Sequence, residues 1–123
     1  MMPDLDTDAL RYMAADHVDT PAGSLAAAIV VTPDGERLGN LEGIVIDPER
    51  RRASHLVVAA RRLLRTRRYL LPLTASRVVQ QDGGVLVEVG DQDLRQLPEV
   101  PAAGIPPFSE DDLLTAIFAK RVA

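Results

Sequence analysis

The chain has 123 residues, of which 46% are hydrophobic and 26% charged, the balance of one ordinary globular domain. It has no cysteine and no tryptophan, which excludes disulfide scaffolds, thiolate nucleophiles and sulfur-based zinc sites and argues against a base- or sugar-stacking pocket. The net charge of −4 divides unevenly, because residues 50–81 hold nine arginines and no acid, whereas the remainder holds five basic and eighteen acidic residues.

The N-terminal segment, residues 1–24, is a polar lead-in. Thr7 could cap a short helix that runs through Tyr12 and Met13, although its apolar face is thin. The segment is acidic where a signal peptide needs positive charge, and the longest apolar run, residues 25–31, is far shorter than a membrane span of roughly 20 residues. We therefore expect a cytoplasmic protein with no membrane span.

Short β-type runs separated by turn residues follow from residue 25. The runs cover residues 28–32, 37–47, 53–60, 69–73, 77–81 and 85–89. They predict a mainly β fold, a small antiparallel β-barrel of five to six strands over residues 25–90, with a C-terminal α-helix. Residues 44–46 and 56–60 are apolar on both faces, so we expect them to be covered on both sides by the closed sheet or by an appended helix.

The tail has two parts. Residues 91–108 contain four prolines and are predicted to be a stiff, non-helical linker. Ser109 is a helix N-cap followed by three acidic residues, which predicts a helix over residues 109–121. Its apolar stripe consists of Leu113, Leu114, Ile117 and Phe118. A helix of about 12 residues is marginal alone, so the stripe must dock on its own barrel, on a second subunit or on another protein.

Six residues have the chemistry of turns and bends. They are Gly35, Gly39, Gly43, Asp47, Pro48 and Pro72. Gly35 suits a turn with positive φ, and the two glycines inside a strand indicate a bulge or a place where another backbone passes closely. Asp47 is expected to accept hydrogen bonds from the amides of the following turn, and Pro72 indicates an edge strand or a bend.

These motifs together resemble a known family. The stretch VVTPDGERLGNLEGIVIDPERRRASHLVVAA, followed by YLLPL, resembles the PRC-barrel family over about residues 25–89. That family includes the cytoplasmic domain of the photosynthetic reaction-centre H subunit and the C-terminal domain of a ribosome-maturation factor. The resemblance implies a small β-barrel, often homodimeric, that docks to proteins rather than catalysing a reaction. No functional residue is carried over, because the family motif consists of turn and core positions.

Candidate chemistry elsewhere is sparse. The histidine His17 lies beside two aspartates, but one histidine in a polar segment is a weak metal-site signal. Ser54 and His55 are neighbours on one predicted strand, so their side chains should point to opposite faces and fail to pair as a nucleophile and its base. We therefore expect no catalytic residue, no cofactor and no metal site.

The stretch RRLLRTRR is the one feature of the sequence that indicates a binding surface. Its basic residues are Arg61, Arg62, Arg65, Arg67 and Arg68. They could bind an acidic partner, RNA or anionic lipid. Two alternatives need no partner, because the arginines could keep a strand edge from aggregating, or they could bind the chain's own acidic termini within a monomer or across a dimer.

The sequence thus predicts a non-catalytic PRC-barrel-like adaptor that acts as a homodimer and recruits a protein partner. The five arginines would form one interaction surface, and the apolar helix face would dock or dimerise. An RNA- or ribosome-associated role is the alternative, although the acidic total and the scarcity of aromatic residues disfavour nucleic acid.

Overall fold

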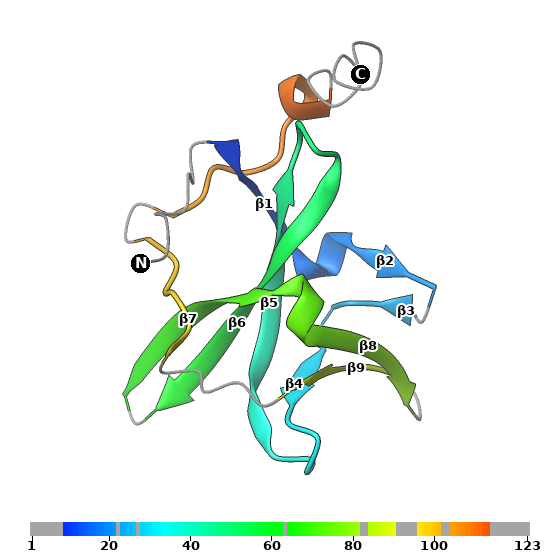
Figure 1. The fold of residues 1–123 in the computed structure, drawn as a ribbon, viewed down its shortest axis with the longest axis vertical. Helices are drawn as coiled ribbons and strands as arrows, with labels where there is room; N and C mark the ends of the chain where they lie inside the picture. The colour runs from blue at the N-terminus through cyan, green and yellow to red at the C-terminus, as the bar shows by residue number, and fades with distance from the viewer. Residues whose placement is uncertain are drawn as a thin grey trace.

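The computed structural model describes residues 9–21, 23–26, 28–62, 64–81, 84–90, 96–101 and 104–113. The described chain is mainly β, as predicted (Figure 1). Its strands are β1 (Arg11–Ala14), β2 (Asp19–Thr20), β3 (Gly23–Ser24), β4 (Ile29–Val31), β5 (Arg37–Asp47), β6 (Arg52–Arg62), β7 (Arg65–Pro72), β8 (Ser76–Gln81) and β9 (Gly84–Val89). Two 3-10 turns, η2 (Ala15–His17) and η3 (Leu73–Ala75), follow β1 and β7.

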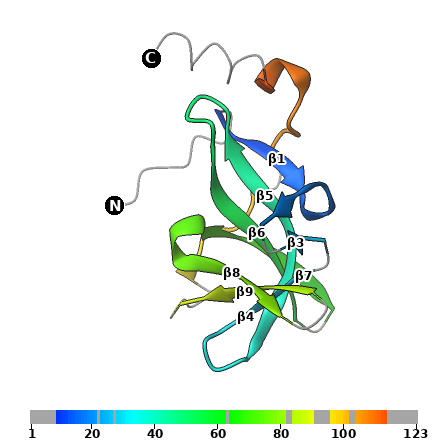
Figure 2. The ribbon, with the colours of Figure 1, turned by 90° about the vertical axis from the view of Figure 1, so that its right-hand side faces the viewer.

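One sheet contains seven of these strands, in the order β7-β6-β5-β4-β9-β8, with β1 paired to the second half of β5. All its pairs are antiparallel except β4 with β9, which are parallel. Figures 1 and 2 show β4, β9 and β8 lying across one end of the long β5–β6 hairpin. The expected closed barrel is not formed by the described strands, because η3 turns the chain between β7 and β8 and these two edges do not pair.

The long strands β5 and β6 bend because extra residues interrupt their pairing. The register shifts between Leu41 and Gly43 and again between Val45 and Ile46, and each shift inserts one unpaired residue. Gly39 lies so close to β6 that a Cβ there would collide with the carbonyl oxygen of Ala59. Gly39 thus lies where another backbone passes closely, and Gly43 directly follows the bulged residue Glu42.

The turn residues also behave as expected. Gly35 has a φ of +88° in the turn between β4 and β5. The Oδ1 of Asp47 accepts hydrogen bonds from the amides of Glu49 at 3.1 Å and Arg50 at 3.2 Å, and Pro48 lies in this turn. Pro72 ends the edge strand β7.

The main core lies on the inner face of the sheet and is aliphatic. Its fully buried members include Val30, Val58, Leu71 and Val87, which come from β4, β6, β7 and β9. These four residues alternate with side chains on the other face of their strands, as the pleat of a sheet requires.

The outer face of the same sheet has its own core. Leu10, Val45, Val57 and Leu70 are buried there, with Tyr12, Val100 and Ile105 packed against them. Two of these covering residues come from the C-terminal segment 96–101 and 104–108, here called the strap. The apolar runs in β5 and β6 are thus covered on both faces, but by the strap and β1 rather than by a closed sheet or a helix.

The strap is held at both ends by backbone hydrogen bonds. Pro98 accepts from the amide of Leu70 at 2.8 Å, and Val100 donates to the carbonyl of Arg68 at 2.9 Å. Further along, Pro106 accepts from the amide of Tyr12 at 2.8 Å, and Phe108 donates to the carbonyl of Tyr12 at 2.9 Å. The strap therefore bonds to the edge strand β7, crosses the sheet face and reaches β1.

Two sequence predictions need correction here. The helix expected from Thr7 to Met13 is wrong where the structure describes it, because β1 pairs with the available edge of β5 and overrides a weak helix signal. The described residues 96–101 and 104–108 contain no α-helix, but they are not a linker, because they bond to β7 and β1 and complete the outer core.

Candidate functional site

The predicted arginine surface is a β-hairpin. Strand β6 continues to Arg62 and β7 begins at Arg65, and these two residues pair, so only two residues separate the strands. The connection expected at residues 61–68 is therefore mostly paired strand. At the turn, Leu64 is 95% exposed.

Two of the five arginines bind carboxylates of the same chain. Arg68 Nε donates to Glu42 Oε2 at 2.6 Å, and Arg67 Nη1 donates to Glu99 Oε1 at 3.5 Å. The hydrogen bond and charge of Glu42 raise the pKa of Arg68. Glu99 belongs to the strap, so the acidic flank of the chain does lie on the basic hairpin at this point. Both pairs are exposed and are worth at most about 1 kcal/mol each.

The other described arginines of the hairpin stay open to solvent. Arg61 and Arg65 are exposed and have no ion-pair partner among the residues that the structure describes. The side chain of Arg62 lies outside the described residues. Hence Arg61, Leu64 and Arg65 form the solvent-facing tip of the hairpin, which projects from the body of the molecule (Figure 1).

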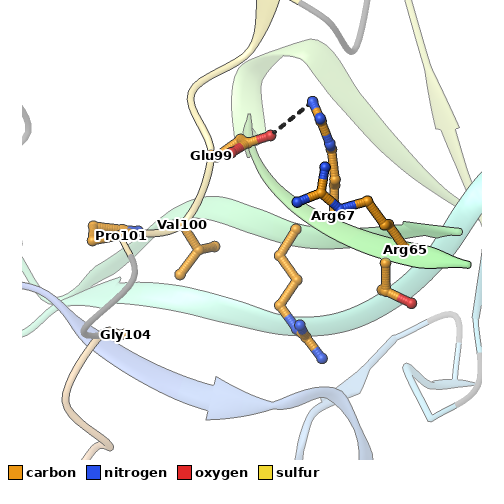
Figure 3. A pocket seen from close by; sticks show the side chains of 8 residues that line it. Arg65, Arg67, Glu99, Val100, Pro101 and Gly104 are labelled. Atoms are coloured by element: carbon orange, nitrogen blue, oxygen red, sulfur yellow. Dashed lines mark hydrogen bonds and ion pairs between the residues drawn. The ribbon is translucent and has the colours of Figure 1, made fainter. Parts of the chain in front are cut away.

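A hollow of about 560 Å³ lies between β7 and the strap (Figure 3). It is lined by Arg65, Thr66, Arg67, Arg68, Glu99, Val100, Pro101 and Gly104. Three arginines against one glutamate give this lining a positive balance. Such a surface attracts anionic groups, and the ion pair between Arg67 and Glu99 spans one side of it.

A smaller hollow of about 280 Å³ adjoins it and is bounded by Tyr12, Glu42 and Val57 among others. The Tyr12 hydroxyl donates to the carbonyl of Glu42 at 2.9 Å, and its ring lies against Gly43, where a Cβ would collide with it. Burial, reinforced by the Glu42 carboxylate and opposed by Arg68, raises the pKa of Tyr12. Tyr12 thus locks β1 onto the bulge of β5.

The prediction that Ser54 and His55 cannot pair is wrong. His55 Nδ1 lies 2.9 Å from Ser54 Oγ, because Ser54 is the extra residue of a bulge, where the alternation of side chains breaks down. Burial lowers the pKa of His55. A nucleophilic serine also needs an acid to orient the histidine, and in the described part of the chain no carboxylate bonds to His55. Ser54, but not His55, lines a hollow of about 480 Å³ whose walls also include Arg50 and Arg52.

The predicted helix begins where expected. Ser109 donates to Asp112 Oδ2 through its amide at 2.8 Å and through its hydroxyl at 3.0 Å, and residues 110–113 are helical. Arg11 Nε donates to Asp112 Oδ1 at 2.7 Å, which ties the helix start to β1. Burial works to raise the pKa of Asp112, but the hydrogen bonds from Ser109 and Arg11 together hold it below its usual value.

Of the four residues of the predicted apolar helix face, the structure describes only the first, Leu113. Leu113 is 52% exposed, and Leu114, Ile117 and Phe118 lie outside the described residues. Figure 1 shows the helix start and the arginine hairpin at different ends of the molecule. The structure therefore does not bring the two predicted interaction surfaces together.

The described residues contain neither a cluster of metal ligands nor a helix that could cross a membrane. Among them, no three His, Asp or Glu side chains gather in a way that would hold a metal ion, and His17 faces only Asp16, at 3.7 Å. Within the same residues, no helix has the length and hydrophobicity needed to cross a membrane.

The family model of the PRC-barrel domain matches residues 21–94. The chain belongs to the PRC-barrel family. The membership predicted from the turn and strand motifs is thereby confirmed. No curated protein matches the chain.

The elements of this PRC-barrel domain that cover its outer face lie beyond the family match. Strand β1 precedes residue 21 and the strap follows residue 94. The match itself contains the sheet strands β4 to β9 and the arginine hairpin. The cover of the outer face is thus built from residues on either side of the matched range.

The sequence indicated the arginines but not the two glutamates that form ion pairs with them. Glu42 and Glu99 are separated from their arginines by 26 and 32 residues, so no local pattern connects them. The exposed Leu64 did carry a signal, because an apolar pair stands in the middle of RRLLRTRR.

Proposed function

We propose that this PRC-barrel domain is a non-catalytic adaptor that acts as a homodimer and recruits a protein partner. The observation that carries the proposal is the difference between the two edges of the sheet. The β7 edge is bonded to the strap, whereas the outer edge of β8 pairs with no other described strand.

An unpaired edge strand presents a row of backbone donors and acceptors, which is what an extended segment of a partner needs in order to add a strand. Strand β8 pairs with β9 over six residues without a register shift, so no bulge interrupts its outer edge. Arg77 and Gln80 are exposed along it. Such an edge gives affinity through the backbone, and the exposed side chains give selectivity.

The dimer is assigned to the helix that begins after Ser109. Leu113, the first residue of the predicted apolar stripe, is 52% exposed, and an exposed leucine next to further apolar residues favours burial against a second copy. The place of this helix, away from β8 in Figure 1, would leave the open edge of each protomer accessible.

Two proline variants test the edge. Successive amides of a strand point to opposite sides, so Arg77 and Gln80, which differ by an odd number of positions, direct their N–H groups to opposite edges. One of the two variants, Arg77→Pro or Gln80→Pro, therefore removes a backbone hydrogen bond to β9 and lowers the stability of the fold. The other removes only an N–H group that points away from β9, and so blocks the outer edge alone. Both native side chains are exposed, so neither substitution removes a buried side chain.

The assay is affinity capture from native lysate with mass spectrometry, preceded by thermal unfolding to identify the folded variant. The adaptor proposal expects the folded edge-blocked variant to lose a protein that the wild type retains. Equal capture by wild type and this variant would contradict it. Capture of RNA that falls steeply with salt would favour the RNA-associated alternative.

A further inference from the structure

The arginine hairpin ends in an apolar residue that neither the core nor the turn requires. Leu64 is 95% exposed, so it contributes almost nothing to folding. Tight hairpin connections favour Asn, Asp and Gly, whereas Leu64 stands in this one. An exposed apolar side chain at this position is available for contact with something outside the domain.

The charged residues beside Leu64 indicate the kind of surface that would bind there. Arg61 and Arg65 are exposed on the two sides of the turn and have no carboxylate partner among the described residues. No acidic residue occurs anywhere between positions 50 and 81. The described carboxylates that pair with the hairpin, Glu42 and Glu99, lie at Arg68 and Arg67, so the tip keeps its positive charge and an anionic surface would attract it.

We infer that the hairpin tip formed by Arg61, Leu64 and Arg65 docks on the surface of an anionic lipid bilayer. Two cationic side chains beside an apolar one match the bilayer interface, where phosphates lie above acyl chains. A narrow convex tip buries little area against a rigid protein, far less than the roughly 1,600 Å² of a standard interface, whereas lipids close around it.

The hollow beside the tip adds a place for a headgroup. Its walls contain Arg65 and Arg67, and Figure 3 shows both side chains at the rim of the hollow that faces the strap. Arg67 is bound to Glu99 only at 3.5 Å, between two half-exposed side chains, so a lipid phosphate would compete for it easily. This inference is independent of the adaptor role, which rests on β8.

Vesicle binding by the full chain tests the inference. The vesicles are phosphatidylcholine alone, and phosphatidylcholine with roughly one third phosphatidylglycerol. We expect binding only to the anionic vesicles, and weaker binding as salt is raised. Leu64→Ser should lower the partition coefficient about tenfold, because one leucine no longer enters the interface.

The arginines should account for the rest of the affinity. Arg61→Gln with Arg65→Gln should lower the partition coefficient by about 25-fold, at about fivefold for each charge, while the matching lysine variant should bind like the wild type. The controls are Leu73→Ser, an exposed leucine in η3, and Arg37→Gln, an exposed arginine at the start of β5. Neither should change binding.

Three results would overturn the inference. The first is no binding to anionic vesicles at low salt. The second is binding that Leu113→Ser abolishes and Leu64→Ser leaves intact, which would assign the bilayer to the C-terminal helix. The third is binding to soluble polyglutamate, but not to vesicles, that needs the arginines and not Leu64, which would assign the tip to an acidic protein.

Discussion

The strap can be tested by shortening one side chain on each side of the outer core. Val57 is only 2% exposed, and Val57→Ala removes two methyl groups that are worth about 1.6 kcal/mol in transfer free energy, plus a small cavity, or about 2 kcal/mol in all. Val100 of the strap lines the same hollow as Val57 and is partly buried. Val100→Ala should therefore cost about half its transfer value, or about 0.8 kcal/mol.

Because the two valines share one cluster, the double variant should lose about 0.5 kcal/mol less than the sum of the single changes. The free energy of unfolding is measured by urea titration and far-UV circular dichroism, since the chain has no tryptophan. The matched control is Leu64→Ala at a leucine that is 95% exposed, which should stay within about 0.5 kcal/mol of the wild type. A neutral Val100→Ala with strictly additive effects would show that the strap is a linker after all.

Three further changes probe other parts of the account. Gly39→Ala places a Cβ against a β6 carbonyl and should cost about 1–3 kcal/mol in the same urea titration, whereas Gly90→Ala, which meets nothing within 4 Å, should cost far less. Burial lowers the pKa of His55 in the fold, so the unfolded chain binds the proton more readily; stability should be constant above about pH 6.5 and fall as the pH drops toward the folded pKa, and His55→Asn should flatten this slope. Leu114→Asp with Phe118→Asp should change the sedimentation coefficient or sharply lower the melting temperature, and a variant that sediments and melts like the wild type would refute helix docking.

Local chemistry explains what the sequence could predict. The turn at Gly35, the hydrogen bonds of Asp47 and the helix start at Ser109 depend on residues within four positions of one another. The family motifs are built from such positions, so strand order along the chain and family membership could be predicted together.

Long-range pairing explains what it could not. Strand β1 exists because β5 offers it an edge, and its own residues carry only a weak signal. The sequence of the strap, with its prolines, is typical of a linker, and only its packing on the outer face of the sheet shows that it is part of the fold. The Ser54–His55 contact depends on a bulge, which shifts the alternation on which the opposite expectation was based.

The candidate site divides in the same way. The arginines are evident from composition, but which of them remain open depends on Glu42 and Glu99 in distant segments. Strand β8 has an open edge because it is the last strand in the sheet order, beyond the parallel pair of β4 and β9. No local sequence pattern indicates this strand order.

Hydrogen–deuterium exchange of the full chain, resolved by residue, tests most directly the claim that one edge of the sheet is covered and the other open. The account predicts slow exchange for the amides of Val100 and Phe108, which donate to β7 and β1, and fast exchange for alternate amides of β8. Fast exchange of the two strap amides, or uniform protection along β8 in the protein without a partner, would contradict it.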